Sequence, residues 1–378
     1  MKPSNIFNLI VKFLHRETRQ GELEQLENWI QDERNTPFFN RIVKIDYLVT
    51  LCMGDYNLQQ AKASIRRKIE VSKRKGRIKV LSRMGIAASL LFLVGIFIFQ
   101  KNNVQPVIES GFNKAVLTFD NGDQIVLEKG KKFKTESIQS DGENLVYSKS
   151  QSNKNAPKSP SYNNLTIPRG GQFFVELSDG TAVWLNSETK IKFPTKFIEG
   201  KTRVLTLEYG EVYLDVSPSS QHAGSKFIVL SKNQEIEVFG TQFNIKAYEQ
   251  DSSIVTTLVE GEILLKTPTD QTLLKPNQQS KVTASTSKIT VEEVDALQIV
   301  SWKNGLFAFE QETLGEMMKI LSRWYNVEVV FETAVRKNYT FTGILERSQS
   351  LAALLEIIAT SSGGEVKFEI SDQSIIIK

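Results

Sequence analysis

The feature that most constrains this chain is a run of 16 residues without a charge, Met84–Phe99 (MGIAASLLFLVGIFIF). A helix rises about 1.5 Å per residue, so this run would extend roughly 24 Å, slightly short of the hydrocarbon thickness of about 30 Å. Flanking side chains such as Arg83 can lengthen it by snorkelling. A helix in a globular core would keep a polar face, but only Ser89 interrupts this apolar surface. The run therefore predicts one transmembrane helix over 84–100.

The charges beside this run predict which side of the membrane each part occupies. Residues 1–83 hold 17 Lys and Arg against 9 Asp and Glu, a net charge of +8. Ten of these basic residues lie between Lys62 and Arg83, a density that also suits contact with anionic membrane lipid. The positive-inside rule puts 1–83 in the cytoplasm and residues 100–378 outside it. More than eighty residues precede the run, so it is not a secretory signal peptide, and we expect a single-pass membrane protein.

Residues 1–83 have the pattern of a small all-α bundle. Apolar residues recur at helical spacing in three or four short segments, of which the third begins at Thr36-Pro37. About eighty residues in such short helices bury a limited core, so a bundle of this kind often completes its core on a partner. Trp29, Phe38 and Phe39 are candidate contacts with that partner, although the same side chains could simply close the bundle.

The composition argues against metal and cofactor chemistry. The chain has one cysteine, Cys52, and two histidines, His15 and His222, which lie far apart in the sequence. This excludes a disulfide framework and a multi-cysteine metal cluster, and it gives no metal-ligand spacing. We expect no catalytic residue, no cofactor-binding site and no metal site.

Beyond the apolar run the hydrophobic period changes from 3.6 to 2, which is typical of strands. We expect a hairpin region and a linker over 101–164, with the polar stretch Ser148–Asn164 as a loop, and an all-β domain over 165–298. Many short strands without a helical interval indicate a sandwich or a solenoid-like stack.

Four short segments in this region are predicted turns. Asp120-Asn121-Gly122-Asp123 and Ser178-Asp179-Gly180 lie between alternating apolar runs and predict hairpins, because glycine accepts the positive φ of a tight turn. Tyr209-Gly210 and Glu260-Gly261 are interpreted in the same way, as turns that separate two strands.

Residues 299–378 have a different pattern, β-α-β followed by β-α-β-β, which predicts a small α+β module with its helices on one sheet face. The two predicted helices are Thr313–Tyr325 and Leu351–Ala359. The segments Val327–Phe331 and Ser374–Ile377 could be sheet edges that pair with a partner strand, or ordinary sheet interior.

Several short motifs occur in one order behind the predicted span. Each is little more than a turn between strands, but together they resemble the FecR family of transmembrane anti-sigma factors, in the long variant common among Bacteroidetes. The motifs are Ile167-Pro168-Arg169-Gly170-Gly171-Gln172, Leu177-Ser178-Asp179-Gly180-Thr181, Val183-Trp184-Leu185-Asn186, Gly210-Glu211-Val212-Tyr213, Val238-Phe239-Gly240-Thr241-Gln242-Phe243-Asn244 and Leu258-Val259-Glu260-Gly261.

The C-terminal stretch carries a second resemblance. Trp302-Lys303-Asn304-Gly305-Leu306-Phe307, followed by Leu321-Ser322-Arg323-Trp324-Tyr325, is similar to the module that ends these proteins, which has the short N-terminal fold of secretins and TonB-dependent transporters (STN). Within it, Trp324 and Tyr325 are candidate partner contacts.

The resemblance implies an inner-membrane protein with its C-terminus in the periplasm, and it also implies a mechanism. The cytoplasmic bundle would hold an extracytoplasmic-function sigma factor, and the C-terminal module would dock on the signalling domain of a TonB-dependent outer-membrane transporter. Arrival of a ligand at that transporter would lead to proteolysis by periplasmic and intramembrane proteases, which frees the cytoplasmic bundle. No direct contact with nucleic acid is implied.

Two other functions fit parts of the sequence. A membrane-anchored periplasmic glycan-active enzyme would need two carboxylates across a cleft, and Glu211 and Asp215 share one strand face because their spacing is even. Solvated acids on a strand explain the same residues. A membrane-bound DNA-binding regulator would use the basic residues 62–83, but the region lacks a clear helix-turn-helix pattern.

Overall fold

The computed structural model describes residues 6, 9, 10, 12, 18, 20–30, 35, 108–148, 161–283, 286–371 and 373–378. The chain divides into two compact units, Met1–Ile98 and Phe99–Lys378. The predicted transmembrane segment 84–100 lies outside the described residues, as do Phe38 and Phe39. Within the described ranges, no helix combines the length and the apolar character that crossing a membrane requires.

In the N-terminal unit the structure describes helix α2 (Gln20–Ile30), which contains Trp29 as expected. Leu26 of this helix packs with a small buried cluster, against which Trp29 and Ile30 are partly buried. The other members of the cluster are Ile6, Leu9 and Ile10, whose spacing places them on one helical face. The rest of the predicted bundle lies outside the described residues.

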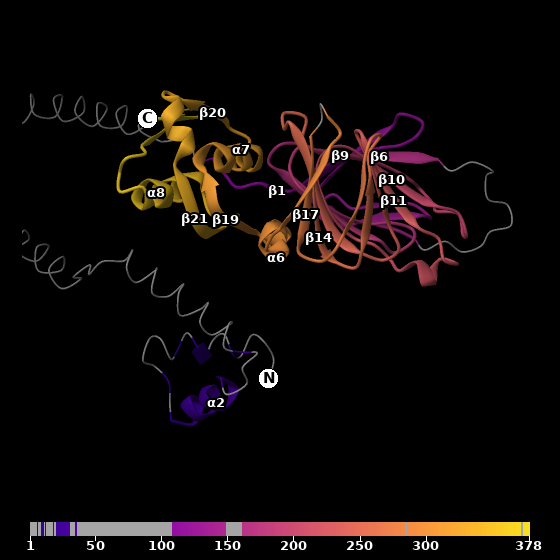
Figure 1. The fold of residues 1–378 in the computed structure, drawn as a ribbon, viewed down its shortest axis with the longest axis horizontal. Helices are drawn as coiled ribbons and strands as arrows, with labels where there is room; N and C mark the ends of the chain where they lie inside the picture. Colours follow the sequence, from indigo (N-terminus) through magenta and orange to yellow (C-terminus); the bar gives the residue numbers. More distant parts are fainter. Residues whose placement is uncertain are drawn as a thin grey trace, which may run out of the picture. The chain divides into compact units, whose positions relative to one another are not determined.

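The second unit begins with an all-β domain, shown from magenta to orange in Figure 1. Alternating apolar residues form its strands, as the period of 2 predicted. The strands are β1 (Phe112–Thr118), β2 (Gln124–Glu128), β3 (Phe133–Lys134), β4 (Ile138–Ser140), β5 (Asn144–Tyr147), β6 (Tyr162–Ile167), β7 (Gly171–Glu176), β8 (Ala182–Leu185), β9 (Thr189–Pro194), β10 (Arg203–Asp215), β11 (Phe227–Ser231), β12 (Gln234–Val238), β13 (Gln242–Ala247), β14 (Ser253–Glu260), β15 (Ile263–Lys266), β16 (Gln271–Leu274), β17 (Gln278–Thr283) and β18 (Ile289–Glu293).

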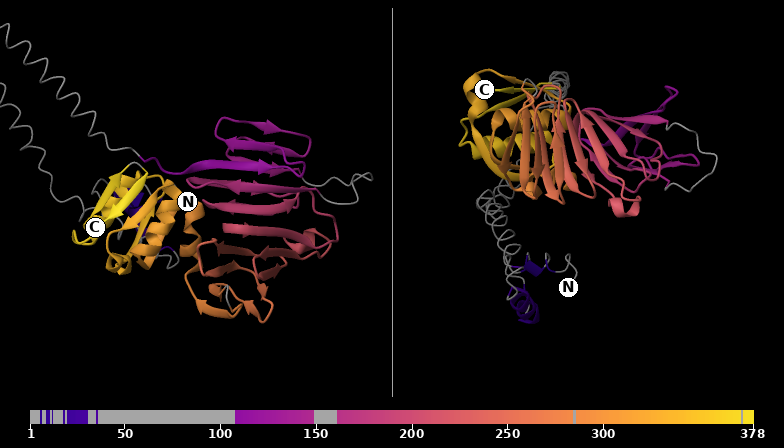
Figure 2. Two further views of the ribbon diagram at one scale, coloured as in Figure 1. Left: turned by 90° about the horizontal axis from the view of Figure 1, so that it is seen from above. Right: turned by 45° about the vertical axis from the view of Figure 1, so that its right-hand side comes forward.

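These strands form two layers around one core. The first layer runs β2-β1-β6-β9-β10-β11-β12-β15-β16. The second runs β3-β4-β5-β7-β8-β10-β13-β14-β17-β18. Figure 2 shows the strands stacked side by side. Tyr147 of the second layer packs edge-on against Phe193 of the first, with ring centroids 5.3 Å apart, so the inner faces of the layers meet.

Strand β10 belongs to both layers, which corrects the predicted turn at Tyr209-Gly210. The register shifts at a bulge between Leu207 and Tyr209, and Gly210 follows with a φ of +104°. The backbone therefore bends from one layer into the other without reversing direction, because a bulge kinks a strand and glycine tolerates the positive φ. Glu260-Gly261 does separate two strands, β14 and β15, but these lie in different layers and do not pair with each other, so the segment is a second bend between the layers and not a reversing turn.

The predicted boundary between 101–164 and 165–298 is also corrected. Strand β6 begins at Tyr162, inside the expected loop Ser148–Asn164, and continues across the boundary. Strand β1 pairs with β6 and also with β7, so the region after residue 108 is part of the same β domain. The sequence pattern missed this because strands that pair over long separations leave no local signal. The two predicted hairpins, β1–β2 and β7–β8, are confirmed.

A short connector, α6 (Ala296–Ile299) and the 3-10 helix η3 (Val300–Asn304), leads to the α+β module. The order of elements is the predicted one. The elements are β19 (Leu306–Thr313), α7 (Leu314–Tyr325), β20 (Glu328–Phe331), η4 (Ala334–Asn338), β21 (Thr340–Glu346), α8 (Leu351–Ser361), β22 (Phe368–Ser371) and β23 (Ser374–Ile377).

The strands of the module form two small sheets, β19-β21 and β20-β23-β22. In the three-stranded sheet β23 is the central strand. The prediction that Ser374–Ile377 could be a sheet edge is therefore wrong, and the alternative, sheet interior, is correct. The apolar run of β23, with Ile375 and Ile377 fully buried, is what a central strand requires. Among the described strands, β20 pairs with β23 alone and is an edge, as proposed for Val327–Phe331.

The bend of β10 gives a stability test. An ideal Cβ on Gly210 would lie 2.6 Å from the Glu188 carbonyl oxygen and would also overlap Thr189. We expect Gly210→Ala to lower the free energy of unfolding by more than about 3 kcal/mol, because overlap with backbone adds to the strain of the positive φ. Thermal or denaturant unfolding of the full chain measures it.

Gly200→Ala is the matched control, because Gly200 also has a positive φ (+73°) but nothing lies within 4 Å of its ideal Cβ. It should cost only about 1 kcal/mol. Equal losses in the two variants would contradict the steric role of Gly210.

Candidate functional site

The outward face of the second layer carries a row of side chains that lie side by side on neighbouring strands. Their register is continuous across the layer. Residues beside them in the sequence, such as Val183 and Val212, point into the core, so the row points outward. The row consists of Asn144, Phe174, Trp184, Tyr213, Asn244, Thr257 and Gln279. The connector and the module cover part of this row and leave the rest open.

The connector covers the middle of the row. Tyr213 is buried against Val300 and Trp302, and the Trp302 indole N–H donates to Asn244 Oδ1 at 3.1 Å. The Tyr213 hydroxyl donates to Gln242 Oε1 at 2.7 Å. Burial, with smaller contributions from Asp215 and Glu260, raises the pKa of Tyr213 to about 12.

The β domain and the α+β module meet at an interface that we call the joint. Its central residue is Arg347 of the module, which is only 2 % exposed. Its guanidinium lies 3.7 Å from the centre of the Trp324 ring, and it donates to Asn186 Oδ1 at 2.8 Å and to the Trp302 carbonyl at 3.1 Å. Burial lowers the pKa of Arg347 to about 10. A buried charge is stable only when it is paired and hydrogen-bonded, so Arg347 ties three elements together.

Glu211 completes the network beneath Arg347. Its carboxylate accepts hydrogen bonds from Asn186 Nδ2 at 2.8 Å and from Asn244 Nδ2 at 3.1 Å. Its negative charge also favours the protonated form of Arg347, raising the pKa of that group against the effect of burial. Glu211 and Asp215 do share one face of β10, as predicted, but Tyr213 stands between them and Glu211 is held by two amides.

Arg323 and Arg169 make a second set of contacts across the joint. Arg323 stacks at 3.7 Å on the ring of Tyr248 and pairs with Glu188, Nε to carboxylate oxygen, at 3.3 Å. Arg169 donates to the carbonyl oxygens of Ser322 and Val327 at 2.9 and 2.8 Å. Burial raises the pKa of Tyr248 well above its ordinary value. Two of the motifs quoted for the family resemblance thus meet at this joint.

The chain entering the β domain also touches the module. An ideal Cβ on Gly111 would lie 2.7 Å from the Trp324 ring, so only glycine permits this close approach. Ile108 packs against the core of the module. A cavity of about 300 Å³ remains within the joint, lined by residues of both domains, among them Glu211 and Arg347.

The candidate partner contacts occupy different environments. Trp324 and Tyr325 are 4 % and 3 % exposed and belong to the core of the module. The Trp324 indole N–H donates to the Arg347 carbonyl at 2.9 Å, and the Tyr325 hydroxyl donates to the Gln349 carbonyl at 2.7 Å. Trp29 is half-buried on α2. Their role as partner contacts stays a prediction.

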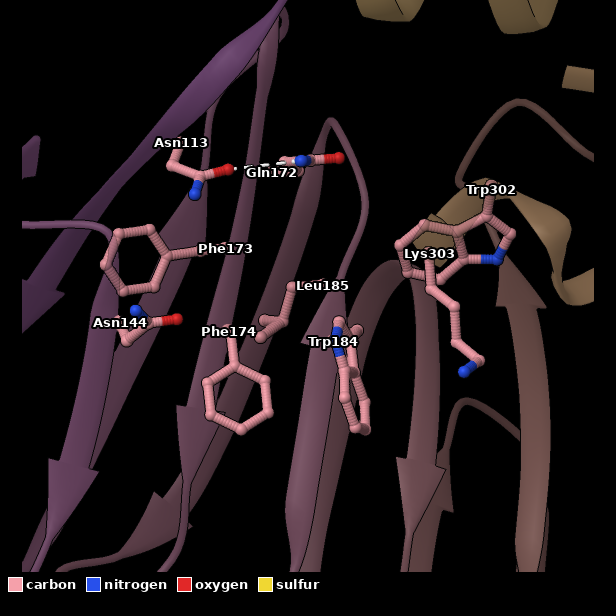
Figure 3. Close-up of a pocket in the computed structure, with 9 residues that line it drawn as sticks. All are labelled: Asn113, Asn144, Gln172, Phe173, Phe174, Trp184, Leu185, Trp302 and Lys303. Carbon is pink, nitrogen blue, oxygen red and sulfur yellow. Dashed lines mark hydrogen bonds between the residues drawn. The ribbon is translucent and has the colours of Figure 1, made fainter. Parts of the chain in front are cut away.

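The open part of the row forms a groove, shown in Figure 3, with a volume of about 360 Å³. Phe174 and Trp184 stand on its floor with ring centroids 4.9 Å apart at 61°. Lys303 of the connector lies over the Trp184 ring, 5.3 Å from its centre. Asn113, Asn144 and Gln172 supply amide groups along the same face. Within the described parts of the chain, no cluster of His, Cys, Asp and Glu could hold a metal ion.

Comparison with known proteins identifies both domains of the second unit. Residues 163–264 match the family described as FecR protein, and residues 306–377 match the family described as FecR, C-terminal. Two crystal structures, at 1.65 and 2.50 Å resolution, of a protein described as an anti-sigma factor from Parabacteroides distasonis are 27 % identical to this chain. They cover 57 % of this chain and 98 % of their own, with a TM-score of 0.51. No curated protein matches this chain.

Both FecR models thus match this chain, in the order that the motif resemblance predicted.

The residues that hold the joint carry little signal in the local sequence. Arg169 and Arg323 lie within motifs, but their partners come from the other domain, 153 and 158 residues away for Arg169 and far upstream, at Glu188 and Tyr248, for Arg323. Arg347 lies outside every quoted motif, and nothing in its local sequence marks it as buried. The signal that could have found the groove is the pair Phe174 and Trp184, which occupy outward positions where a solvated sheet face usually carries polar residues.

Removal of Arg347 should weaken the joint. In Arg347→Met, Asn186 Oδ1 and the Trp302 carbonyl each lose one of two donors, keeping the Ser187 and Gly305 N–H groups, and Glu211 loses a nearby positive charge. We expect a loss of about 3–5 kcal/mol in the free energy of unfolding of the full chain, measured by denaturant titration. Arg336→Met, which removes a guanidinium bound to Tyr339 on the module's surface, should cost less than about 1 kcal/mol. A similar cost in both would show that the joint does not depend on Arg347.

The buried tyrosines predict loss of stability in alkali. Burial raises the pKa of Tyr213 and Tyr325 to about 12, whereas an unfolded tyrosine titrates near its ordinary pKa of about 10. The contribution of these two tyrosines to the free energy of unfolding is complete below about pH 10. It is lost as the pH rises towards 12, because their hydroxyl groups ionise at lower pH in the unfolded chain than in the folded protein. Tyr325→Phe should therefore flatten the decline of unfolding free energy above pH 10. Tyr162→Phe, at an exposed position, should leave the slope of the parent.

Proposed function

We propose that this chain is an anti-sigma factor that relays a signal from a TonB-dependent outer-membrane transporter to an extracytoplasmic-function sigma factor. The observation that carries the proposal is the presence of both FecR domains in one chain, over 163–264 and 306–377. The similar structures from Parabacteroides distasonis, described as an anti-sigma factor, support the same function. Residues 1–83 are then the part that binds the sigma factor in the cytoplasm.

The proposal includes a membrane anchor over 84–100, with the N-terminus cytoplasmic and the C-terminus periplasmic. Its support is the uncharged run Met84–Phe99 and the ten basic residues from Lys62 to Arg83 that precede it. In this arrangement the basic residues contact anionic lipid rather than nucleic acid.

The α+β module is the proposed receiver for the transporter's signalling domain. Strand β20 is an edge among the described strands, and Val330 on it is 52 % exposed. An exposed edge offers unpaired backbone groups to a partner strand, which is the basis of β-augmentation.

The joint gives a physical reason for linking receiver and β domain. Arg347, Arg323 and Arg169 bind the module to the β domain through contacts that are largely buried, so a partner that docks on the module acts on both domains together. A single transmembrane helix is a poor lever for small changes of shape. Cleavage by periplasmic and intramembrane proteases would free residues 1–83 without requiring the helix to transmit a change of shape. The proposed role is regulatory and not enzymatic.

The proposed binding of a sigma factor is tested by co-purification of the full chain with the extracytoplasmic-function sigma factors of its own organism. We expect one of them to be retained, and Trp29→Ala to weaken its retention at least about tenfold, as truncation of a buried aromatic anchor does. Lys12→Ala, which removes only the exposed ion pair with Glu22, is the control and should retain the sigma factor. Recovery of no sigma factor, with salt-sensitive retention on DNA, would instead favour a DNA-binding regulator.

The topology is tested by reporter fusions. A reporter that is active only in the periplasm should work when it is fused after residue 110 and fail after residue 60, because the basic residues 62–83 stay inside. The opposite pattern would overturn the orientation.

A further inference from the structure

We propose that the open groove on the second layer binds a saccharide. We call it the ring groove and define it by Phe174, Trp184, Asn113, Asn144, Gln172 and Lys303 (Figure 3). Its volume of about 360 Å³ falls within the range of small-molecule sites. This inference is independent of sigma-factor binding and concerns the second unit alone.

The floor of the groove suits the apolar face of a sugar ring. Phe174 and Trp184 face each other across neighbouring strands, β7 and β8, and both are half-buried. Their rings are inclined at 61° to each other with centroids 4.9 Å apart, and both line the groove. The C–H groups on one face of a pyranose pack well on such rings, while the hydroxyl groups point to the sides. Aromatic pairs on an outward sheet face usually mean that something covers them.

The polar groups of the groove match hydroxyl groups. Strands β5, β7 and β8 are each paired on both sides, so their backbone groups are used within the sheet. A ligand must therefore find its hydrogen bonds on side chains. The amides of Asn113, Asn144 and Gln172 can each donate and accept, as a sugar hydroxyl does.

Two of these amides are already aligned, because Gln172 Nε2 donates to Asn113 Oδ1 at 3.1 Å. An extended peptide, by contrast, gains its affinity from a free strand edge, and the middle of this layer has none to offer. The lining chemistry therefore favours a saccharide over a peptide.

The charge of the groove favours an acidic sugar. Among the residues that line it, Lys303 is the one charged side chain, and its Nζ lies 4.7 Å from the centre of the Tyr213 ring at the edge of the floor. Asp215 interacts with Lys303 and offsets part of its charge. A sugar carboxylate should therefore gain a modest advantage over a neutral sugar, about threefold in affinity.

The test is calorimetric titration of the full chain, purified in detergent, with three trisaccharides. Chitotriose and cellotriose are neutral, and trigalacturonate is acidic. We expect saturable binding of at least one of them with a Kd of about 0.1–1 mM. Phe174→Ala and Trp184→Ala should each weaken it at least about tenfold, because they remove the stacking floor. Tyr162→Ala, at an exposed tyrosine on the first layer, is the matched control and should bind as the parent does.

Two further variants keep the test decisive if a ring variant unfolds. Gln172→Ala leaves both rings in place and should weaken binding about fivefold through the lost amide. Lys303→Met should abolish the advantage of trigalacturonate and leave the neutral trisaccharides unchanged. The proposal is overturned if none of the three saturates below about 10 mM, or if folded Phe174→Ala, Trp184→Ala and Gln172→Ala all bind like the parent.

Discussion

One buried guanidinium holds the two FecR domains together. Arg347 comes from the module, stacks on a tryptophan of the same module, and donates to Asn186 of the β domain and to the carbonyl of Trp302 in the connector. Asn186 and Asn244 in turn donate hydrogen bonds to the Glu211 carboxylate. The negative charge of Glu211 stabilises the positive charge of Arg347. A cation without these partners could not remain buried, so the position of each domain depends on the other.

The outward face of the second layer is partly covered by the connector and the module and partly open. A single row of side chains crosses the layer from Asn144 on β5 to Gln279 on β17, and each strand between these two contributes one member. The connector and the module cover its middle and far part, where Tyr213 and Asn244 are buried. The near part, with Phe174 and Trp184, remains open and has the chemistry of a ligand groove. The connector, through Trp302 and Lys303, therefore determines where the groove ends.

Local patterns in the sequence predicted most elements but not their long-range relations. Alternating residues and glycine turns predicted the β1–β2 and β7–β8 hairpins, and apolar spacing predicted α7, because these features depend on neighbours in the chain. The sequence around Gly210 fits a turn as well as a bulge, since both accept a glycine with positive φ. The joint could not be predicted from local sequence, because Arg347 and Asn186 are 161 residues apart. Predicting it would require knowing which surfaces of the two domains pack together.

The way the chain enters the β domain has a mechanical consequence. Gly111 passes tightly over Trp324, and the next residues form β1, which lies inside the first layer between β2 and β6. Tension applied along the chain from the N-terminal side would load these ladders lengthwise, so that several hydrogen bonds share the force at once instead of opening one by one. The point of attachment is therefore built to withstand pulling.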